Sequence, residues 1–249
     1  MNPTGRFADR AADYVVGRPS YPDAAIDALL AGLGDPRDVV VADVGAGTGI
    51  SSRLLAARGA QVLAIEPNAA MRAAAEPHGR VEWIAATGEE TGLEEASVDL
   101  VSVFQAFHWL DHAQALREFV RILRPGGRAA VVYNERDERD PFTAAFGALV
   151  RRYSTDDTER RRADALAAFE AFEGWHTPRR LTFRNEHVLD LAGVIARARS
   201  SSYLPKEGPA GEALRDELHE LVARFERDGA VTMTIQTIVA MGDVGGDGG

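Results

Sequence analysis

A glycine-rich segment at residues 41–49 is the feature of this sequence that most restricts its possible folds. The segment has the sequence VADVGAGTG, in which an apolar run passes directly into three glycines. A strand, a glycine turn and a helix in succession let backbone N–H groups approach a nucleotide-like ligand closely. The next apolar run ends at Glu66, 23 residues after Asp43, and a ribose-binding acid is expected about 20 residues further on in one strand–helix–strand unit. These residues predict a nucleotide-like ligand at the end of a parallel sheet.

The spacing of the glycines distinguishes between ligands. A dinucleotide-binding turn has the pattern G-x-G-x-x-G, with its third glycine where the helix packs on the strand near the pyrophosphate. Here the pattern is D-x-G-x-G-x-G, and Ile50 stands where that third glycine would be. The spacing therefore disfavours a nicotinamide or flavin oxidoreductase, although a tight glycine turn without any ligand remains the simpler alternative for the turn alone.

Composition restricts the class of protein further. The chain has 249 residues, no cysteine and a net charge of −10, so it has no thiolate metal site and no Cys nucleophile. The acidic balance argues against a nucleic-acid partner. No run approaches 18 apolar residues and the N-terminus has no apolar core, so we expect a cytoplasmic protein without a membrane partner. The basic run 160–162 follows acidic residues, which indicates a solvated helix face.

Helix and strand patterns alternate through the first half, as expected for a parallel sheet with right-handed crossovers. We predict a single α/β domain over residues 1–241, with a doubly wound, seven-stranded Rossmann-like sheet whose last strand is antiparallel and lies beside the fifth. A helical lid is expected at about 141–175 and 195–210, and the glycine-rich tail 242–249 is expected to be disordered. The expected strands are 39–44, 61–66, 81–85, 98–103, 128–133, 181–189 and 231–240, and the expected helices are 50–58, 69–76, 113–123 and 211–228.

Residues that follow the strands are candidates for chemistry, because ligands lie outside the carboxyl ends of parallel strands. After the fourth strand come Phe104, Gln105, Phe107, His108 and Trp109, an aromatic wall with a few polar groups. Aromatic faces attract cations, so this wall suits a flat or cationic ligand. His108 is the candidate catalytic base, with structural packing of His108 and Trp109 as the alternative. The predicted substrate pocket consists of Phe107, His108, Trp109, Asn134 and Arg136. No metal site is predicted.

The glycine motif resembles motif I of the class I S-adenosylmethionine-dependent methyltransferases. Further motifs are similar to the methyltransferase domain 11 family, in the small-molecule subgroup related to trans-aconitate methyltransferase. They are YVVGRPSYP at 14–22, QAFHW at 105–109, LRPGG at 123–127, VYNERD at 132–137 and SSSYLP at 200–205.

This resemblance implies S-adenosyl-L-methionine as the cofactor and S-adenosyl-L-homocysteine as its product. Glu66 would hold the ribose, and Arg18 would neutralise the cofactor carboxylate. Thr87 stands where relatives place an Asp that bonds the adenine amine, so its hydroxyl or the backbone would make that contact. The implied cofactor-binding residues are Asp43, Gly45, Ala46, Gly47, Glu66, Pro67, Thr87, Gly88, Glu89, Phe104, Gln105, Tyr14 and Arg18.

The reaction expected from the resemblance is methyl transfer to a small-molecule acceptor by in-line displacement. A carboxylate acceptor needs no base, whereas a phenol or amine would benefit from His108. An acidic acceptor would need arginines, and Arg18, Arg136, Arg197 and Arg199 are available, although they also read as surface charge. The alternative is a protein that binds S-adenosylmethionine without methylating, as a cyclase or regulatory module. The sequence leaves open the acceptor atom (O, N or C), the pathway and the oligomeric state.

Overall fold

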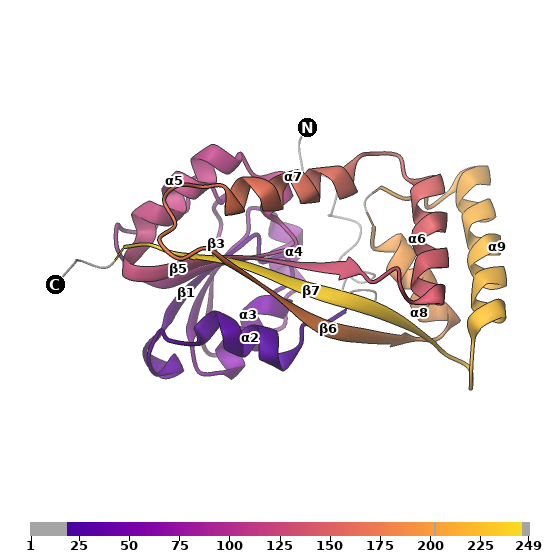
Figure 1. Cartoon of the computed structure of the whole chain (residues 1–249), viewed down its shortest axis with the longest axis horizontal. Helices are drawn as coiled ribbons and strands as arrows, with labels where there is room; N and C mark the ends of the chain where they lie inside the picture. Colours follow the sequence, from indigo (N-terminus) through magenta and orange to yellow (C-terminus); the bar gives the residue numbers. More distant parts are fainter. Residues whose placement is uncertain (1–18, 202, 246–249) are drawn as a thin grey trace.

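A seven-stranded sheet forms the centre of the molecule (Figure 1), in a computed structural model that describes residues 19–201 and 203–245. The strand order is β3-β2-β1-β4-β5-β7-β6, and β7 runs antiparallel to both of its neighbours. The predicted seven-stranded α/β sheet with an antiparallel last strand beside the fifth is therefore confirmed. The strands are β1 (Val40–Val44), β2 (Gln61–Ile65), β3 (Val81–Ile84), β4 (Val98–Phe104), β5 (Leu123–Arg136), β6 (Arg179–Leu189) and β7 (Val231–Asp243).

Helices cover both faces of the parallel half, as buried parallel strands require. Helices α2 and α3 pack on one face, and α5 and α7 pack on the other (Figure 1). The helices are α2 (Asp23–Leu30), α3 (Ile50–Ala57), α4 (Ala69–Ala73), α5 (His112–Ile122), α6 (Pro141–Tyr153), α7 (Thr158–Glu170), α8 (Leu191–Arg199) and α9 (Gly208–Phe225), with short 3-10 turns η2 (Pro36–Asp38) and η3 (Phe107–Trp109). Within the described ranges, no helix is both long and apolar enough to cross a membrane.

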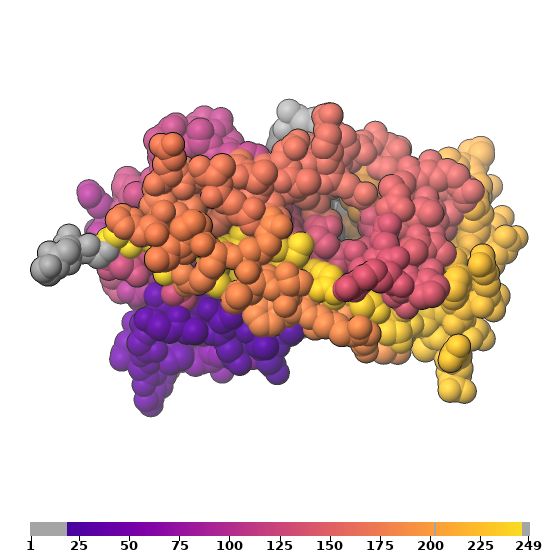
Figure 2. Space-filling view, viewed as in Figure 1, coloured from indigo at the N-terminus to yellow at the C-terminus, as the bar shows by residue number. Residues whose placement is uncertain are grey.

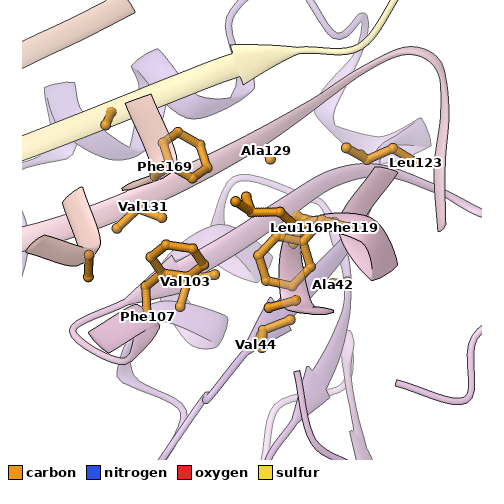
Figure 3. Packing of buried hydrophobic residues seen from close by; sticks show 14 of the residues in the cluster. Ala42, Val44, Val103, Phe107, Leu116, Phe119, Leu123, Ala129, Val131 and Phe169 are labelled. Atoms are coloured by element: carbon orange, nitrogen blue, oxygen red, sulfur yellow. The ribbon is translucent and has the colours of Figure 1, made fainter. Parts of the chain in front are cut away.

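The core between the sheet and α5 and α7 is built from aromatic and branched side chains (Figure 3). Phe107, Phe119 and Phe169 are fully buried there, and the ring of Phe107 lies 5.9 Å from that of Phe169. This packing holds α7 against that face of the sheet. The space-filling view shows α7, in orange-red, along the upper side of the molecule and α9, in yellow, at one end (Figure 2).

The long strands β5, β6 and β7 extend past the parallel half, and helices α6, α8 and α9 pack on that extension. Strand β5 is longer than the predicted 128–133 because its pairing with β7 continues to Arg136. It also begins earlier, at Leu123, so Pro125 and the two following glycines form an irregularity within the strand instead of a stop after α5. Helices α2 and α8 were not among the predicted helices, although Asp190 caps the start of α8 by accepting the backbone N–H of Gly193.

The tail prediction was wrong at its first residues. Gly242 and Asp243 continue β7, where they pair with Ala129 and Arg128 of β5. The physical reason is an ion pair: Arg128 donates to Asp243 over 2.6 Å, and its side chain is only 7% exposed. Arg128 also donates to the carbonyls of Leu29 and Ala31 at the end of α2. One guanidinium therefore joins β5, β7 and α2. Residues 246–249 lie outside the described residues.

Replacement of Arg128 by Ala should lower the free energy of unfolding by about 3–5 kcal/mol, because it leaves Asp243 and two helix-end carbonyls without this partner. Arg37→Ala is the control, since Arg37 is 74% exposed in its pair with Asp35 and should change stability by less than about 1 kcal/mol. Urea unfolding measures both values, and equal effects would contradict this role for Arg128.

The ion pair between Arg128 and Asp243 also predicts that stability depends on pH. Burial alone would raise the pKa of Asp243, but hydrogen bonds from Arg128 and Arg179 hold it below its usual value. A carboxyl with a lowered folded-state pKa contributes stability above its unfolded-state pKa and loses that contribution as the pH falls through the folded-state value. As the pH falls below about 5, the free energy of unfolding should therefore decrease less in Arg128→Ala than in the wild type. Urea unfolding at a series of pH values measures this difference.

Candidate functional site

The turn between β1 and α3 has the backbone conformation that only glycine adopts readily. Gly45, Gly47 and Gly49 have φ values of +67°, +59° and +76°. Space restricts two of them further: a Cβ at Gly45 would lie 2.6 Å from the Cβ of Ala106, and one at Gly49 would lie 2.9 Å from the ring of Trp83. The turn therefore brings its backbone against neighbouring elements more closely than any side chain would permit.

Glu66, at the end of β2, is held by the same turn. One carboxylate oxygen accepts the backbone N–H of Gly47 at 2.9 Å, and the other accepts that of Asn68 at 2.8 Å. Burial raises the pKa of Glu66, whereas these two hydrogen bonds and the charge of Arg72 oppose the rise. The orientation of the carboxylate is thus fixed, and the free-energy cost of its burial is only partly offset. It is therefore suited to accept hydrogen bonds from a ligand's hydroxyl groups.

Asp43 does not lie with the other predicted cofactor residues. Its side chain is fully buried beneath the turn, where Ser51 and Ser52 of α3 donate to one carboxylate oxygen at 2.7 and 2.6 Å. Ser102 of β4 donates to the other at 3.0 Å. Burial raises the pKa of Asp43, and the three serine hydroxyls oppose that rise. Asp43 therefore positions the turn from below, and its expected contact with a cofactor stays a prediction.

A cavity of about 210 Å³ opens at the carboxyl ends of β1, β2, β4 and the loop after β3. Most of the predicted cofactor residues line it, as do His108 and Trp109. Ala46 lines a smaller adjoining cavity instead. Tyr14 and Arg18 lie outside the described residues. The predicted residues that line the main cavity are Gly45, Gly47, Glu66, Pro67, Thr87, Gly88, Glu89, Phe104, Gln105, His108 and Trp109.

His108 is oriented by Tyr133 of β5. The Tyr133 oxygen accepts the backbone N–H of His108 at 3.0 Å and lies 3.2 Å from its Nδ1. Burial raises the pKa of Tyr133, so this hydroxyl stays neutral. When Nδ1 carries the proton and donates to Tyr133, the Nε2 lone pair of His108 is available to accept a proton. The arrangement meets the geometric requirement for a base that is held in one orientation.

Three residues of the predicted substrate pocket do not line the cavity. Phe107 is fully buried in the core, because its 3-10 turn directs the ring toward α7. Asn134 accepts a hydrogen bond from Thr237 of β7 at 2.5 Å and lines only the smaller cavity. Arg136 forms ion pairs with Glu159 and Glu138. The position of these residues near a strand end predicted which part of the fold they occupy, but not where their side chains point.

The basic run on α7 faces inward, so the expectation of a solvated helix face was wrong for two of its three residues. Arg162 lines the cavity and lies 5.0 Å from the centre of the Tyr133 ring, and Arg161 lies 4.8 Å from the Trp109 ring. Arg160 is 75% exposed. The spacing from Thr158 to Arg162 and on to the buried Leu166 is four residues each time, which places the three on one helix face. That period is the signal that would have identified Arg162.

Gln105 joins α7 to the end of β4. Its φ of +58° is unusual for a residue other than glycine, and such conformations are concentrated at functional sites. Its side-chain oxygen accepts a hydrogen bond from Arg162. The backbone of Gln105 is held by β5, since its N–H donates to the Val132 carbonyl at 2.9 Å. The strained residue and the arginine above it thus form one wall of the cavity.

Arg197 of α8 and Tyr203 also line the cavity, together with Asn68, Met71, Ala106, Leu110 and Thr158. Burial alone would raise the pKa of Tyr203. The pKa nevertheless lies below its usual value, because the tyrosine is surrounded by the positive charges of Arg197, Arg162 and Arg136. Three guanidinium groups therefore act on Tyr203 at this end of the cavity, which the sequence motif around Tyr203 did not predict.

Comparisons with known proteins agree with this geometry. Residues 42–131 match a family model described as a methyltransferase domain. An uncharacterized methyltransferase of Mycobacterium tuberculosis is 42% identical over 149 residues, which cover 59% of each chain. The malonyl-[acyl-carrier protein] O-methyltransferase of Pseudescherichia vulneris is 35% identical over 123 residues, which cover 49% of each chain. The aligned part thus spans about half to six-tenths of these relatives.

The fold is also similar to solved structures. A candidate type II methyltransferase from Anaeromyxobacter dehalogenans superposes with a TM-score of 0.67, covering 92% of this chain and 99% of the other at 22% identity. At that identity the likeness concerns the fold. It covers much more of the chain than the residues matched by the family model.

Gly45 is constrained by its positive φ and by the close approach of Ala106. The variants Gly45→Ala and Gly92→Ala distinguish these two constraints. Both glycines have positive φ, +67° and +74°, but a Cβ at Gly92 meets nothing within 4 Å. Gly92→Ala should cost about 1–2 kcal/mol of stability for the backbone conformation alone. Gly45→Ala should cost about 1–3 kcal/mol more, because its methyl group must displace Ala106. Equal losses in urea unfolding would show that the close approach at Gly45 is not tight.

Proposed function

We propose that this chain is a class I S-adenosylmethionine-dependent methyltransferase and that it transfers the methyl group of S-adenosylmethionine to a small-molecule acceptor. The observation that carries the proposal is the joint placement of the glycine turn and the Glu66 carboxylate at one cavity. A nucleoside with two free ribose hydroxyls and no phosphate matches that pair of groups.

The residues of the β1–β2 half of the cavity fit this cofactor. The Glu66 carboxylate is desolvated enough for burial to raise its pKa, so two hydroxyl donors would compensate it. Gly88 supplies a second close approach, since a Cβ there would lie 2.7 Å from Val44. We assign the ribose to Glu66, the methionine part to the backbone of Gly45 and Gly47, and the adenine to the neighbourhood of Pro67 and Thr87.

The acceptor is proposed to bind at the β4–β5 half. When bound, S-adenosylmethionine supplies a methyl group that is already activated by positive sulfur. The protein's part is to align the acceptor in line with that group, and alignment of this kind is worth up to about 7–11 kcal/mol of the barrier. The wall formed by Gln105 and Trp109 orients the two reactants, and α7 shields them from water.

His108 is proposed as the general base for an acceptor whose nucleophile carries a proton. Tyr133 holds its ring, and the lone pair on Nε2 would receive the proton. For a carboxylate acceptor no base is required, and His108 then contributes to the shape of the wall. The name of the Pseudescherichia vulneris relative specifies an oxygen acceptor in a malonyl group, which supports oxygen as the first acceptor atom to test here.

An acceptor screen that measures formation of S-adenosylhomocysteine tests the proposal directly. We expect product above the acceptor-free background with at least one carboxylic acid, phenol or amine of a small-molecule panel. Binding of S-adenosylmethionine without product from any acceptor would instead favour the non-methylating alternative.

His108→Asn then tests the base, with His112→Asn as the matched control because His112 does not line the cavity. With a phenol or amine acceptor, His108→Asn should lower kcat by about 10²–10⁴-fold, whereas His112→Asn should leave it nearly unchanged. With a carboxylate acceptor both variants should stay within a few-fold of the wild type. A phenol-methylating enzyme that is indifferent to His108→Asn would exclude the residue as the base.

A further inference from the structure

We propose that the acceptor carries an oxyanion, a carboxylate or a phosphate group, and that Arg162 and Arg197 bind it at the β4–β5 end of the cavity. This inference rests on the proposed methyl transfer, since it identifies the chemical class of the acceptor.

Arg162 lies on the acceptor side of the sheet. Its guanidinium donates to the side chain of Gln105 and to the Asn134 carbonyl at 3.3 Å, and it stacks over Tyr133. Gln105 follows β4, whereas Tyr133 and Asn134 belong to β5. Glu66 lies at the end of β2, and β1 separates β2 from β4 in the sheet. Arg162 is therefore on the opposite side of the glycine turn from the group proposed to hold the ribose.

Arg162 is largely withdrawn from water but incompletely paired. Its side chain is 13% exposed, and its Nε is buried without a hydrogen-bond partner. Its described ion pair is with Glu135, at 3.5 Å, and the Glu135 side chain is 39% exposed. A buried cation with one distant, solvated carboxylate keeps part of its desolvation cost. An oxyanion in the cavity would supply the missing acceptor and charge, in the planar geometry that guanidinium groups favour.

Arg197 reaches the same space from a different element. It lies on α8 and lines both the main cavity and the smaller cavity, which share Gly45, Phe104 and Gln105 as lining residues. The charges of Arg197 and Arg162 both act on Tyr203, whose pKa they lower against the effect of burial. Two helices thus bring two like charges to one part of the cavity, an arrangement that an anionic ligand stabilises.

Three other charged groups near this point have well-defined partners. Arg136 is held by Glu159 and Glu138, outside the lining. Of the carboxylates that do line the cavity, Glu66 accepts the N–H groups of the β1 turn and of Asn68, and Glu89 accepts the backbone N–H of Asp111 at 2.8 Å. These two lie on the loops after β2 and β3, so the cavity has a negative end for the nucleoside and a positive end for the acceptor.

The experiment titrates citrate and, separately, pyrophosphate into the full chain saturated with S-adenosylhomocysteine, by calorimetry. Citrate probes a carboxylate ligand and pyrophosphate a phosphate ligand. The variants are Arg162→Gln and Arg197→Gln. Arg160→Gln on α7 and Arg199→Gln on α8 are matched controls, because both of these arginines are exposed.

We expect at least one anion to bind the saturated wild type, and each site variant to weaken that binding by about tenfold or more, as expected for a lost charged hydrogen bond. Affinity for S-adenosylhomocysteine should stay within about twofold in all four variants, and the controls should leave anion binding unchanged. Binding of citrate alone identifies a carboxylate acceptor, and binding of pyrophosphate alone identifies a phosphate.

Three results would overturn the inference, and they are distinguishable. Absence of S-adenosylhomocysteine binding to the wild type would remove the proposed function itself. Normal binding of S-adenosylhomocysteine with no binding of either anion would remove the oxyanion class alone. A tenfold loss of S-adenosylhomocysteine affinity in Arg162→Gln or Arg197→Gln would show that the arginine serves the cofactor's own carboxylate instead.

Discussion

The buried carboxylate of Asp43 is the interaction on which the geometry of this site depends. It receives hydroxyl groups from the first turn of α3 and from β4, and therefore fixes the helix and the neighbouring strand relative to β1. With those elements fixed, the glycine turn can come within contact of Ala106. The Gly47 N–H then reaches Glu66 at the end of β2. A buried carboxyl group beneath the turn thus sets the position of the groups proposed to contact the ligand.

The sheet divides the cavity into two chemically different halves. Strands β1, β2 and β3 contribute backbone N–H groups and carboxylates, whereas β4, β5 and the helices above them contribute aromatic rings and guanidinium groups. This division follows from the strand order, because β1 and β4 are neighbours and the chain reverses its direction of winding between them. A nucleoside and an anion would therefore be separated by the glycine turn and by Gln105, where the methyl group must pass.

Local sequence predicted the parts of the site that depend on local geometry. The turn needs positive φ at fixed positions, and Glu66 follows one strand–helix–strand unit later. The spacing of residues in the sequence therefore predicts both. Phe107 and Arg162 show why the rest was not. The direction of Phe107 is set by packing against Phe169, 62 residues away in the chain. Arg162 faces inward because Leu166 and Phe169 anchor the same helix face in the core, a tertiary contact that a charge count cannot reveal.

The most direct test of the account is calorimetric binding of S-adenosylmethionine and S-adenosylhomocysteine, with NADH for comparison, to the wild type and to Glu66→Ala. We predict micromolar binding of the first two, no binding of NADH, and a loss of about ten- to a hundredfold in Glu66→Ala, as expected when hydrogen bonds to a charged group are removed. Tight binding of NADH, or unchanged affinity for S-adenosylhomocysteine in Glu66→Ala, would contradict the account.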